Sequence, residues 1–137
     1  MAVNACGEIY DQDKILAGAL ADDDRTIISS HRLMLEGYER NMGGNTSIGC
    51  IITNADLTKT ECRMVSTMAH DGLARSIRPV HTSMDGDTLF TMASGEVKTT
   101  IDTVGYLAEE AVRLAVLDAA ASAEGMGGRP AYRDIIK

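Results

Sequence analysis

The stretch Ser47–Thr53, SIGCIIT, constrains the fold of this chain more than any other feature. It is nearly continuous in apolar residues, and four of its seven positions are β-branched. This composition predicts a strand that is covered on both faces. A chain of 137 residues is long enough for one domain and supplies few elements for such cover. The sequence therefore looks like part of a larger fold, which would supply the missing cover.

Two helices are predicted after this strand. Thr58 and Glu61 have the spacing of a capping box, in which each side chain bonds the backbone N–H of the other residue. The first helix continues from there until Pro79 ends it, and its apolar stripe consists of Val65, Met68, Ala69, Gly72, Leu73 and Ile77. The second is predicted from about Ile101 to Ala123, and its apolar side carries Val104, Leu107, Ala108, Ala111, Leu114, Ala115 and Leu117.

The remaining segments give shorter signals. Between the helices, Met84–Gly86 predicts a turn, and Thr88–Ala93 predicts a second strand that Ser94–Glu96 breaks. The segments ahead of Ser47 are predicted as a short strand at Ala2–Tyr10 that Gly7 interrupts, a polar passage at Asp11–Arg25, a helix at Thr26–Arg40 and a loop at Asn41–Asn45. The order of strands and helices predicts an α/β fold, with a sheet covered by helices.

Charge and composition narrow the function classes. The formal net charge of −7 argues against nucleic-acid binding, because contacts to phosphates need a basic face. No apolar run reaches the length of a membrane span, and Met1–Asn4 lacks the charged-then-apolar layout of a signal sequence. A cytoplasmic location is therefore the default expectation.

Neither a metal nor a cofactor is expected. The cysteines lie far apart and fit reduced thiols better than a disulfide framework; they are Cys6, Cys50 and Cys62. The histidines show no metal-ligand spacing; they are His31, His70 and His81. We interpret His70 as a structural residue that contacts a helix end or a polar partner.

The segment Gly44–Ser47, which leads into the strand at Ser47–Thr53 and which we call the seam, is open to two interpretations. A turn that leads into a strand is the more common meaning of such a stretch. A phosphate loop is excluded, because no Lys follows the glycines in the required pattern. The second interpretation is a hydroxyl nucleophile, Thr46, at the start of a strand. Such a hydroxyl needs a base, and the sequence has no signature of a catalytic triad.

Cleavage of the Asn45–Thr46 peptide bond would supply that base. The freed α-amine of Thr46 would have a pKa of about 8 and could act as the base, directly or through water. Attack of the Thr46 hydroxyl on the Asn45 carbonyl, an acyl shift to oxygen and hydrolysis of the ester would create this new terminus. Gly43 and Gly44 permit bent backbone conformations, and the branched Cβ of Thr46 restricts its hydroxyl to few positions.

Several blocks of the sequence, taken together, resemble the L-aminopeptidase/D-esterase family, which includes the β-peptidyl aminopeptidases. The blocks are Gly44–Gly49, Thr53–Lys59, Met68–Arg75, Ile77–Thr82 and Asp85–Phe90. The resemblance is strong over the C-terminal two-thirds of the chain and looser over Ala2–Asp11.

The resemblance implies a self-processing hydrolase of the N-terminal-nucleophile type. The implied fold is a layered α/β/β/α sandwich, of which this chain is a C-terminal part. On this sequence, 1–45 would end the α-subunit segment, 46–124 would form the β-subunit segment, and 125–137 would be a loose tail. The implied activity is release of N-terminal amino acids from peptides, amides or esters. The expected partners are such substrates and further copies of the chain, with no nucleic acid and no membrane.

The resemblance also implies a set of site residues around Thr46 and Asn45. Asn4 matches a family residue that helps to form the oxyanion hole, where one donor is worth ~3 kcal/mol; alternatively it caps a strand. Ser83 and Asp85 match a hydroxyl and a carboxylate that support the nucleophile in some members; alternatively they belong to a solvated turn. Family members carry a long segment ahead of the Asn4 strand, with a tyrosine of the oxyanion hole, and the sequence shows no counterpart of it.

Two other functions stay open. The chain could be a catalytically inactive fragment or an oligomerising domain, which the partly uncovered strand favours. It could also be an acyltransferase of the ornithine acetyltransferase type. Those enzymes share the chemistry of the seam, but the blocks after Thr53 resemble them less.

Overall fold

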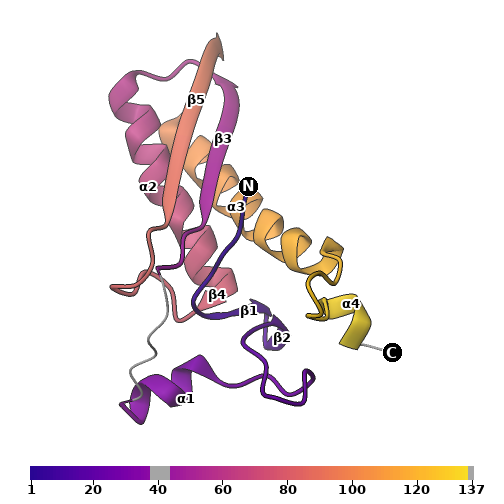
Figure 1. Ribbon diagram of the computed structural model, residues 1–137. Coiled ribbons are helices and arrows are strands. Elements are labelled where there is room, and N and C mark those ends of the chain that lie inside the picture. The colour runs from indigo at the N-terminus through magenta and orange to yellow at the C-terminus, as the bar shows by residue number, and fades with distance from the viewer. Residues whose placement is uncertain (38–43, 136–137) are drawn as a thin grey trace.

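The computed structural model describes residues 1–37 and 44–135 and shows a mixed α/β fold (Figure 1). Its main sheet consists of two parallel strands, β3 (Ile48–Ala55) and β5 (Thr88–Val97). Helices α2 (Lys59–Ser76) and α3 (Ile101–Ser122) pack together on one face of that sheet. Parallel neighbours need a crossover connection, and α2 provides it. The predicted α/β class is confirmed, and one helical layer covers one face of the main sheet.

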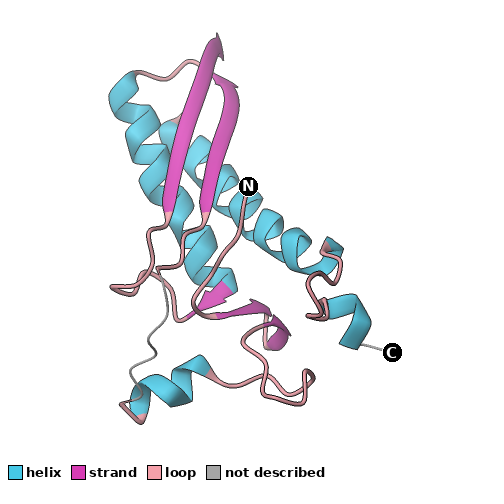
Figure 2. Ribbon diagram, viewed as in Figure 1, coloured by secondary structure: helices cyan, strands magenta, loops and turns pink. Residues whose placement is uncertain are grey.

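A smaller antiparallel sheet lies below the main one in the view of Figure 2. Its order is β2-β1-β4, with β1 at Glu8–Asp11, β2 at Lys14–Ala17 and β4 at Ile77–Arg78. Because β4 directly follows α2, this sheet is tied to the helical layer. The short helix α1 (Ser30–Leu35) joins it through the buried carboxylate of Glu8, which accepts a hydrogen bond from the Ser30 backbone N–H.

The start and the apolar stripe of α2 agree with the prediction. The Thr58 N–H donates to Glu61 Oε2 at 2.7 Å, and the Glu61 N–H donates to Thr58 Oγ1 at 3.3 Å, so both halves of the capping box form. Val65, Ala69 and Leu73 are completely buried. The helix ends at Ser76, before Pro79.

The predicted bounds of α3 were nearly right, but the prediction of which side of the helix is buried was partly wrong. Leu107 and Leu114 are 60% and 52% exposed, whereas Val112 and Val116 are buried. The close approach of the two helices at Gly72 explains the difference. A Cβ atom at Gly72 would lie only 2.2 Å from the carbonyl oxygen of Glu109 and 3.0 Å from the Cβ of Val112. This contact fixes the rotation of α3 and turns Val112 toward α2.

Three predictions ahead of the main sheet need correction. The strand predicted at Ala2–Tyr10 begins only at Glu8, directly after the predicted interruption at Gly7, which packs so close to the Pro79 carbonyl that a Cβ would lie 2.1 Å away. The predicted polar passage contains the strand β2, reached through a turn with Gln12 at a φ of 54°. The helix predicted at Thr26–Arg40 is limited to α1 among its described residues. Residues 38–43 lie outside the described part of the chain.

The break predicted at Ser94–Glu96 is wrong, because β5 continues to Val97. Gly95 takes a φ of +81°, which glycine adopts without steric cost. The pairing shifts register between Thr53 and Ala55, and beyond that shift the Asp56 N–H donates to the Val97 carbonyl at 2.7 Å. The strand therefore absorbs an irregularity and continues past it.

The expected cover on both faces of Ser47–Thr53 is also wrong for the described residues. Both long helices lie on the same side of the sheet (Figure 1). The opposite side, which we call the open face, exposes 82% of Ile52, 55% of Phe90 and 63% of Met92. After α3, the chain turns at Met126–Arg129 and ends its described part in α4 (Tyr132–Ile135).

Candidate active site at the Asn45–Thr46 seam

The seam lies beside the segment Met84–Thr88, which holds its backbone from one side. The Asn45 N–H donates to the Met84 carbonyl at 3.0 Å, and the Asn45 carbonyl accepts from the Gly86 N–H at 2.7 Å. The Thr88 N–H donates to the Ser47 carbonyl at 2.9 Å. These bonds continue the parallel register of β3 and β5, in which Ile48 pairs with Thr88 and Asn45 forms a bridge with Asp85.

The N-terminal segment holds the other edge of the strand. The Ala2 N–H donates to the Ile48 carbonyl at 2.8 Å, and the Ile48 N–H donates back to the Ala2 carbonyl at 2.9 Å. This antiparallel bridge is isolated and joins that pair of residues alone. Asn4 lies two residues beyond it. Asn4 is exposed.

Thr46 is exposed, and its hydroxyl makes no hydrogen bond within the described residues. The Cα of Gly86 lies close to this hydroxyl, because a Cβ built there would be 2.7 Å from Thr46 Oγ1. Asn45 on one side of Thr46 and Ser47 on the other are both hydrogen bonded to the Met84–Thr88 segment. The structure thus presents a free hydroxyl next to a peptide bond that is fixed on both sides.

Asp87 also reaches the seam, and the sequence analysis missed it. Its Oδ1 accepts a hydrogen bond from the Ser47 N–H at 2.8 Å. The Ser47 side chain is completely buried, and its Oγ has no hydrogen-bond partner among the described residues. Pairing the two predicted strands in parallel from their first residues would have placed Asp85–Asp87 beside the seam, and this signal was available in the sequence.

The side chains of Ser83 and Asp85 do not bond to Thr46. Asp85 Oδ2 accepts from the Thr82 N–H at 2.9 Å and from the Thr82 hydroxyl at 2.8 Å. Ser83 is exposed and makes no hydrogen bond within the described part of the chain. The backbone of this turn meets the seam, whereas these two side chains stabilise the turn or face solvent.

A histidine pair connects α2 with the loop that leads to this turn. His70 Nδ1 and His81 Nε2 are 3.0 Å apart, so one ring donates and the other accepts. Burial of the His70 ring lowers its pKa, the nearby His81 lowers it further, and Asp87 and Asp71 oppose the shift. His81 has a φ of 54°. The polar partner expected for His70 is therefore the other histidine.

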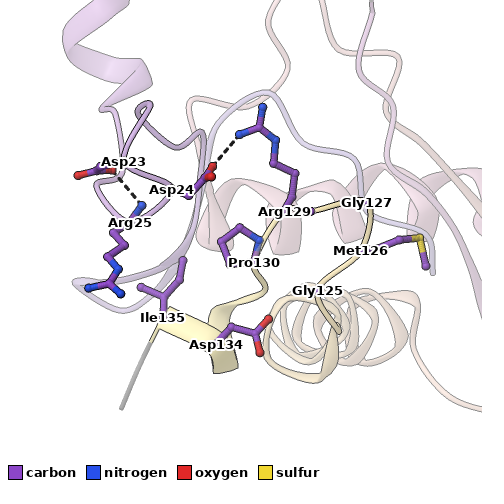
Figure 3. A pocket seen from close by; sticks show the side chains of 11 residues that line it. Asp23, Asp24, Arg25, Gly125, Met126, Gly127, Arg129, Pro130, Asp134 and Ile135 are labelled. Carbon is purple, nitrogen blue, oxygen red and sulfur yellow. Dashed lines mark hydrogen bonds and ion pairs between the residues drawn. The ribbon is translucent and has the colours of Figure 1, made fainter.

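A hollow of about 790 Å³ lies elsewhere, between the turn at Asp23–Arg25 and the segment Gly125–Ile135 (Figure 3). Asp24 and Arg129 form an ion pair across it at 2.7 Å. Its lining residues include no hydroxyl or thiol side chain, so the seam is the better candidate site for the predicted chemistry. Among the described residues, no cluster of three His, Cys, Asp or Glu side chains could hold a metal ion. None of the described helices is long and apolar enough to cross a membrane.

Comparison with known proteins agrees with the resemblance seen in the sequence. Residues 6–133 match the model of peptidase family S58. An uncharacterized aminopeptidase of Mycobacterium leprae (strain TN) is 41% identical over 103 residues, which are 64% of this chain and 28% of that protein. A 6-aminohexanoate-oligomer endohydrolase of Paenarthrobacter ureafaciens is 41% identical over 54 residues, which are 39% of this chain and 15% of that protein.

An uncharacterized aminopeptidase of Mycobacterium tuberculosis (strain H37Rv) is 39% identical over 106 residues, which are 66% of this chain and 31% of that protein. The chain thus spans under a third of the length of these relatives. The family match nevertheless covers nearly all of the chain. The chain belongs to peptidase family S58.

Proposed function

We propose that this chain carries the nucleophile of a self-processing aminopeptidase or amidase. Cleavage between Asn45 and Thr46 generates a Thr46 whose hydroxyl attacks the substrate and whose α-amine serves as the base. The substrates are peptides, amides or esters with a free N-terminal amino acid, which the enzyme releases. The observation that carries the proposal is the exposed Thr46 hydroxyl beside a peptide bond fixed on both sides by hydrogen bonds.

Two further facts support this proposal. Membership of a peptidase family favours hydrolysis of peptide-like bonds, and the names of two relatives refer to an aminopeptidase and to an oligomer endohydrolase. An N-terminal threonine also needs no triad, because its own amine replaces the histidine. The bridge between Ala2 and Ile48 holds the N-terminal segment against the strand that follows Thr46, which is compatible with a role of the Asn4 amide in binding the oxyanion.

The first experiment follows the intact mass of the protein expressed from the complete open reading frame. We expect two fragments that separate between Asn45 and Thr46, together with hydrolysis of aminoacyl nitroanilides. Thr46→Ala should abolish both, and Thr46→Ser should retain both, because serine keeps the hydroxyl. Thr99→Ala removes another exposed threonine hydroxyl and serves as the matched control. Hydrolysis that persists in Thr46→Ala would remove Thr46 from the role of nucleophile.

A second candidate function is an inactive domain that only oligomerises, and the open face favours it. Phe90 and Met92 expose more than half of their side chains there. Contiguous exposed apolar surface often marks an interaction site. A stable oligomer of uncleaved chains that hydrolyses no aminoacyl amide and dissociates after Phe90→Glu would support this candidate.

Transfer of an acetyl group from an acetylated amino acid, in place of hydrolysis, would instead indicate the acyltransferase.

A further inference from the structure

The backbone N–H of Gly86 donates a hydrogen bond to the carbonyl oxygen of Asn45 at 2.7 Å. This carbonyl belongs to the peptide bond whose cleavage we propose. The donor is therefore already directed at the oxygen that would become negatively charged if the Thr46 hydroxyl attacked. A preorganised donor at such an oxygen is the largest single contribution in many acyl-transfer reactions.

A side chain at position 86 would crowd the Thr46 hydroxyl. A Cβ atom there would lie 2.7 Å from Thr46 Oγ1, 3.6 Å from the Asn45 carbonyl oxygen and 3.7 Å from the Cβ of Thr46. The first of these distances is shorter than real Cβ contacts allow. Any side chain at position 86 would thus displace the hydroxyl. Gly86 has no positive φ, so its conformation alone does not require glycine.

We propose that the Gly86 N–H is the oxyanion donor for self-cleavage at Asn45–Thr46; this inference rests on the self-processing proposed above. In the first step, Thr46 Oγ1 forms a bond to the Asn45 carbonyl carbon, and the carbonyl electrons move to the oxygen that Gly86 binds. The C–N bond then breaks, and the proton that the hydroxyl loses ends on the Thr46 nitrogen. Water finally hydrolyses the ester, which gives the Asn45 carboxylate and restores the hydroxyl.

The absence of a side chain and the position of the donor act together in this mechanism. The Gly86 N–H binds the oxygen of the scissile bond, while the bare Cα leaves the space in which the hydroxyl lies. The neighbouring Asp87 holds the Ser47 N–H at 2.8 Å on the far side of Thr46. The reacting atoms are therefore positioned by one short segment, and the donor needs no rearrangement when the charge develops.

The decisive test replaces the Gly86 amide with an ester. Glycolic acid incorporated at position 86 during translation of the complete open reading frame removes the N–H and keeps the absence of a side chain. The matched control is the hydroxy-acid analogue of threonine at position 88. It removes the Thr88 N–H bond to the Ser47 carbonyl, which is 2.9 Å long and belongs to the same ladder. Pulse–chase labelling gives the first-order rate constant of self-cleavage for each protein.

We expect the ester at position 86 to slow self-cleavage by about 10²–10³-fold, as loss of one oxyanion donor does in other enzymes. The ester at position 88 should cleave at a rate close to that of the all-amide protein. Equal slowing in both esters would overturn the inference, because it would mean general weakening of the ladder. An unchanged rate at position 86 would also overturn it. If the all-amide protein stays uncleaved, the proposed function itself fails.

A genetic test addresses the space beside the hydroxyl. Gly86→Ala should slow self-cleavage by about 10²-fold, which is the cost of a displacement of roughly 1 Å at a reacting group. Thr99→Ala, at an exposed position beyond the end of β5, is the control. Equal rates for the two variants would contradict the proposed requirement for glycine at position 86.

Discussion

The two faces of the β3–β5 sheet differ in what the chain provides for them. On the helical face, Leu73 of α2 and Val116 of α3 are completely buried, and Leu89 of β5 packs beneath them. On the open face, Ile52 remains 82% exposed. Burial of a leucine or valine side chain contributes about 1.5–3 kcal/mol, so the described chain gains its stability from one face of the sheet. The seam leads directly into β3, so its geometry depends on the packing of the helical face.

The largest effect that we expect comes from the helical face. Leu73→Ala should lower the free energy of unfolding by about 2–5 kcal/mol, because the vacated space cannot fully collapse. Leu107→Ala on the exposed side of α3 is the matched control and should change it by less than about 0.5 kcal/mol. Urea denaturation measures both. An equally large loss in Leu107→Ala would mean that this side of α3 is wrongly assigned as exposed.

The N-terminal cap of α2 should show a moderate effect on stability. Thr58→Ala removes the side chain that accepts the Glu61 N–H, and we expect a loss of about 1 kcal/mol in the free energy of unfolding. Thr60→Ala changes an exposed threonine in the same helical turn that caps nothing. It should be neutral or slightly stabilising. A similar loss in both variants would show that the capping box contributes little.

A smaller effect should depend on pH. Burial, and then His81, lowers the pKa of His70 in the folded chain below the ordinary value of 6.5. The unfolded chain therefore binds a proton more readily, and the stabilisation present above pH 6.5 is lost as the pH falls toward the folded pKa. Urea midpoints above and below pH 6.5 should show this loss in the parent and a weaker one in His70→Gln. The same loss in both would assign it to other groups.

The smallest effect belongs to the open face. Ile52→Thr keeps a β-branched residue in the strand and removes apolar surface that is already in contact with water. The free energy of unfolding of the 137-residue chain should stay within about 0.5 kcal/mol of the parent value. Urea denaturation beside Leu73→Ala gives the contrast directly. A loss as large as that of Leu73→Ala would show that something covers this face in solution.

The elements that the sequence predicted well have local causes. The capping box of α2 and the apolar periodicity of both long helices are local signals, and they gave nearly correct bounds. The misses have causes elsewhere in the chain or in unusual turns. Strand β2 follows a turn at Gln12 and Asp13, in which Gln12 takes the positive φ although glutamine is not a usual turn residue. The extension of β5 depends on the irregular pairing around Gly95.

The site shows the same division between local and distant causes. Thr46 and Asn45 stand out in the sequence because the seam and its family resemblance are contiguous. Gly86 and Asp87 reach the seam only through the parallel register, as the Ser47–Asp87 bond joins residues 40 positions apart. Nothing in the sequence shows that a backbone N–H at position 86 points at the Asn45 carbonyl. Such a contact follows from strand pairing and from the absence of a side chain.

The separate anchoring of Asn45 and Ser47 has a consequence for any protein nicked between them. Asn45 would stay attached through its N–H to the Met84 carbonyl, and Ser47 would keep its bonds to Asp87 and Thr88. The bridge between Ala2 and Ile48 and the pairing of β1 with β4 also join the two pieces. The two fragments would therefore migrate as one species in a native gel and separate only in a denaturing detergent gel.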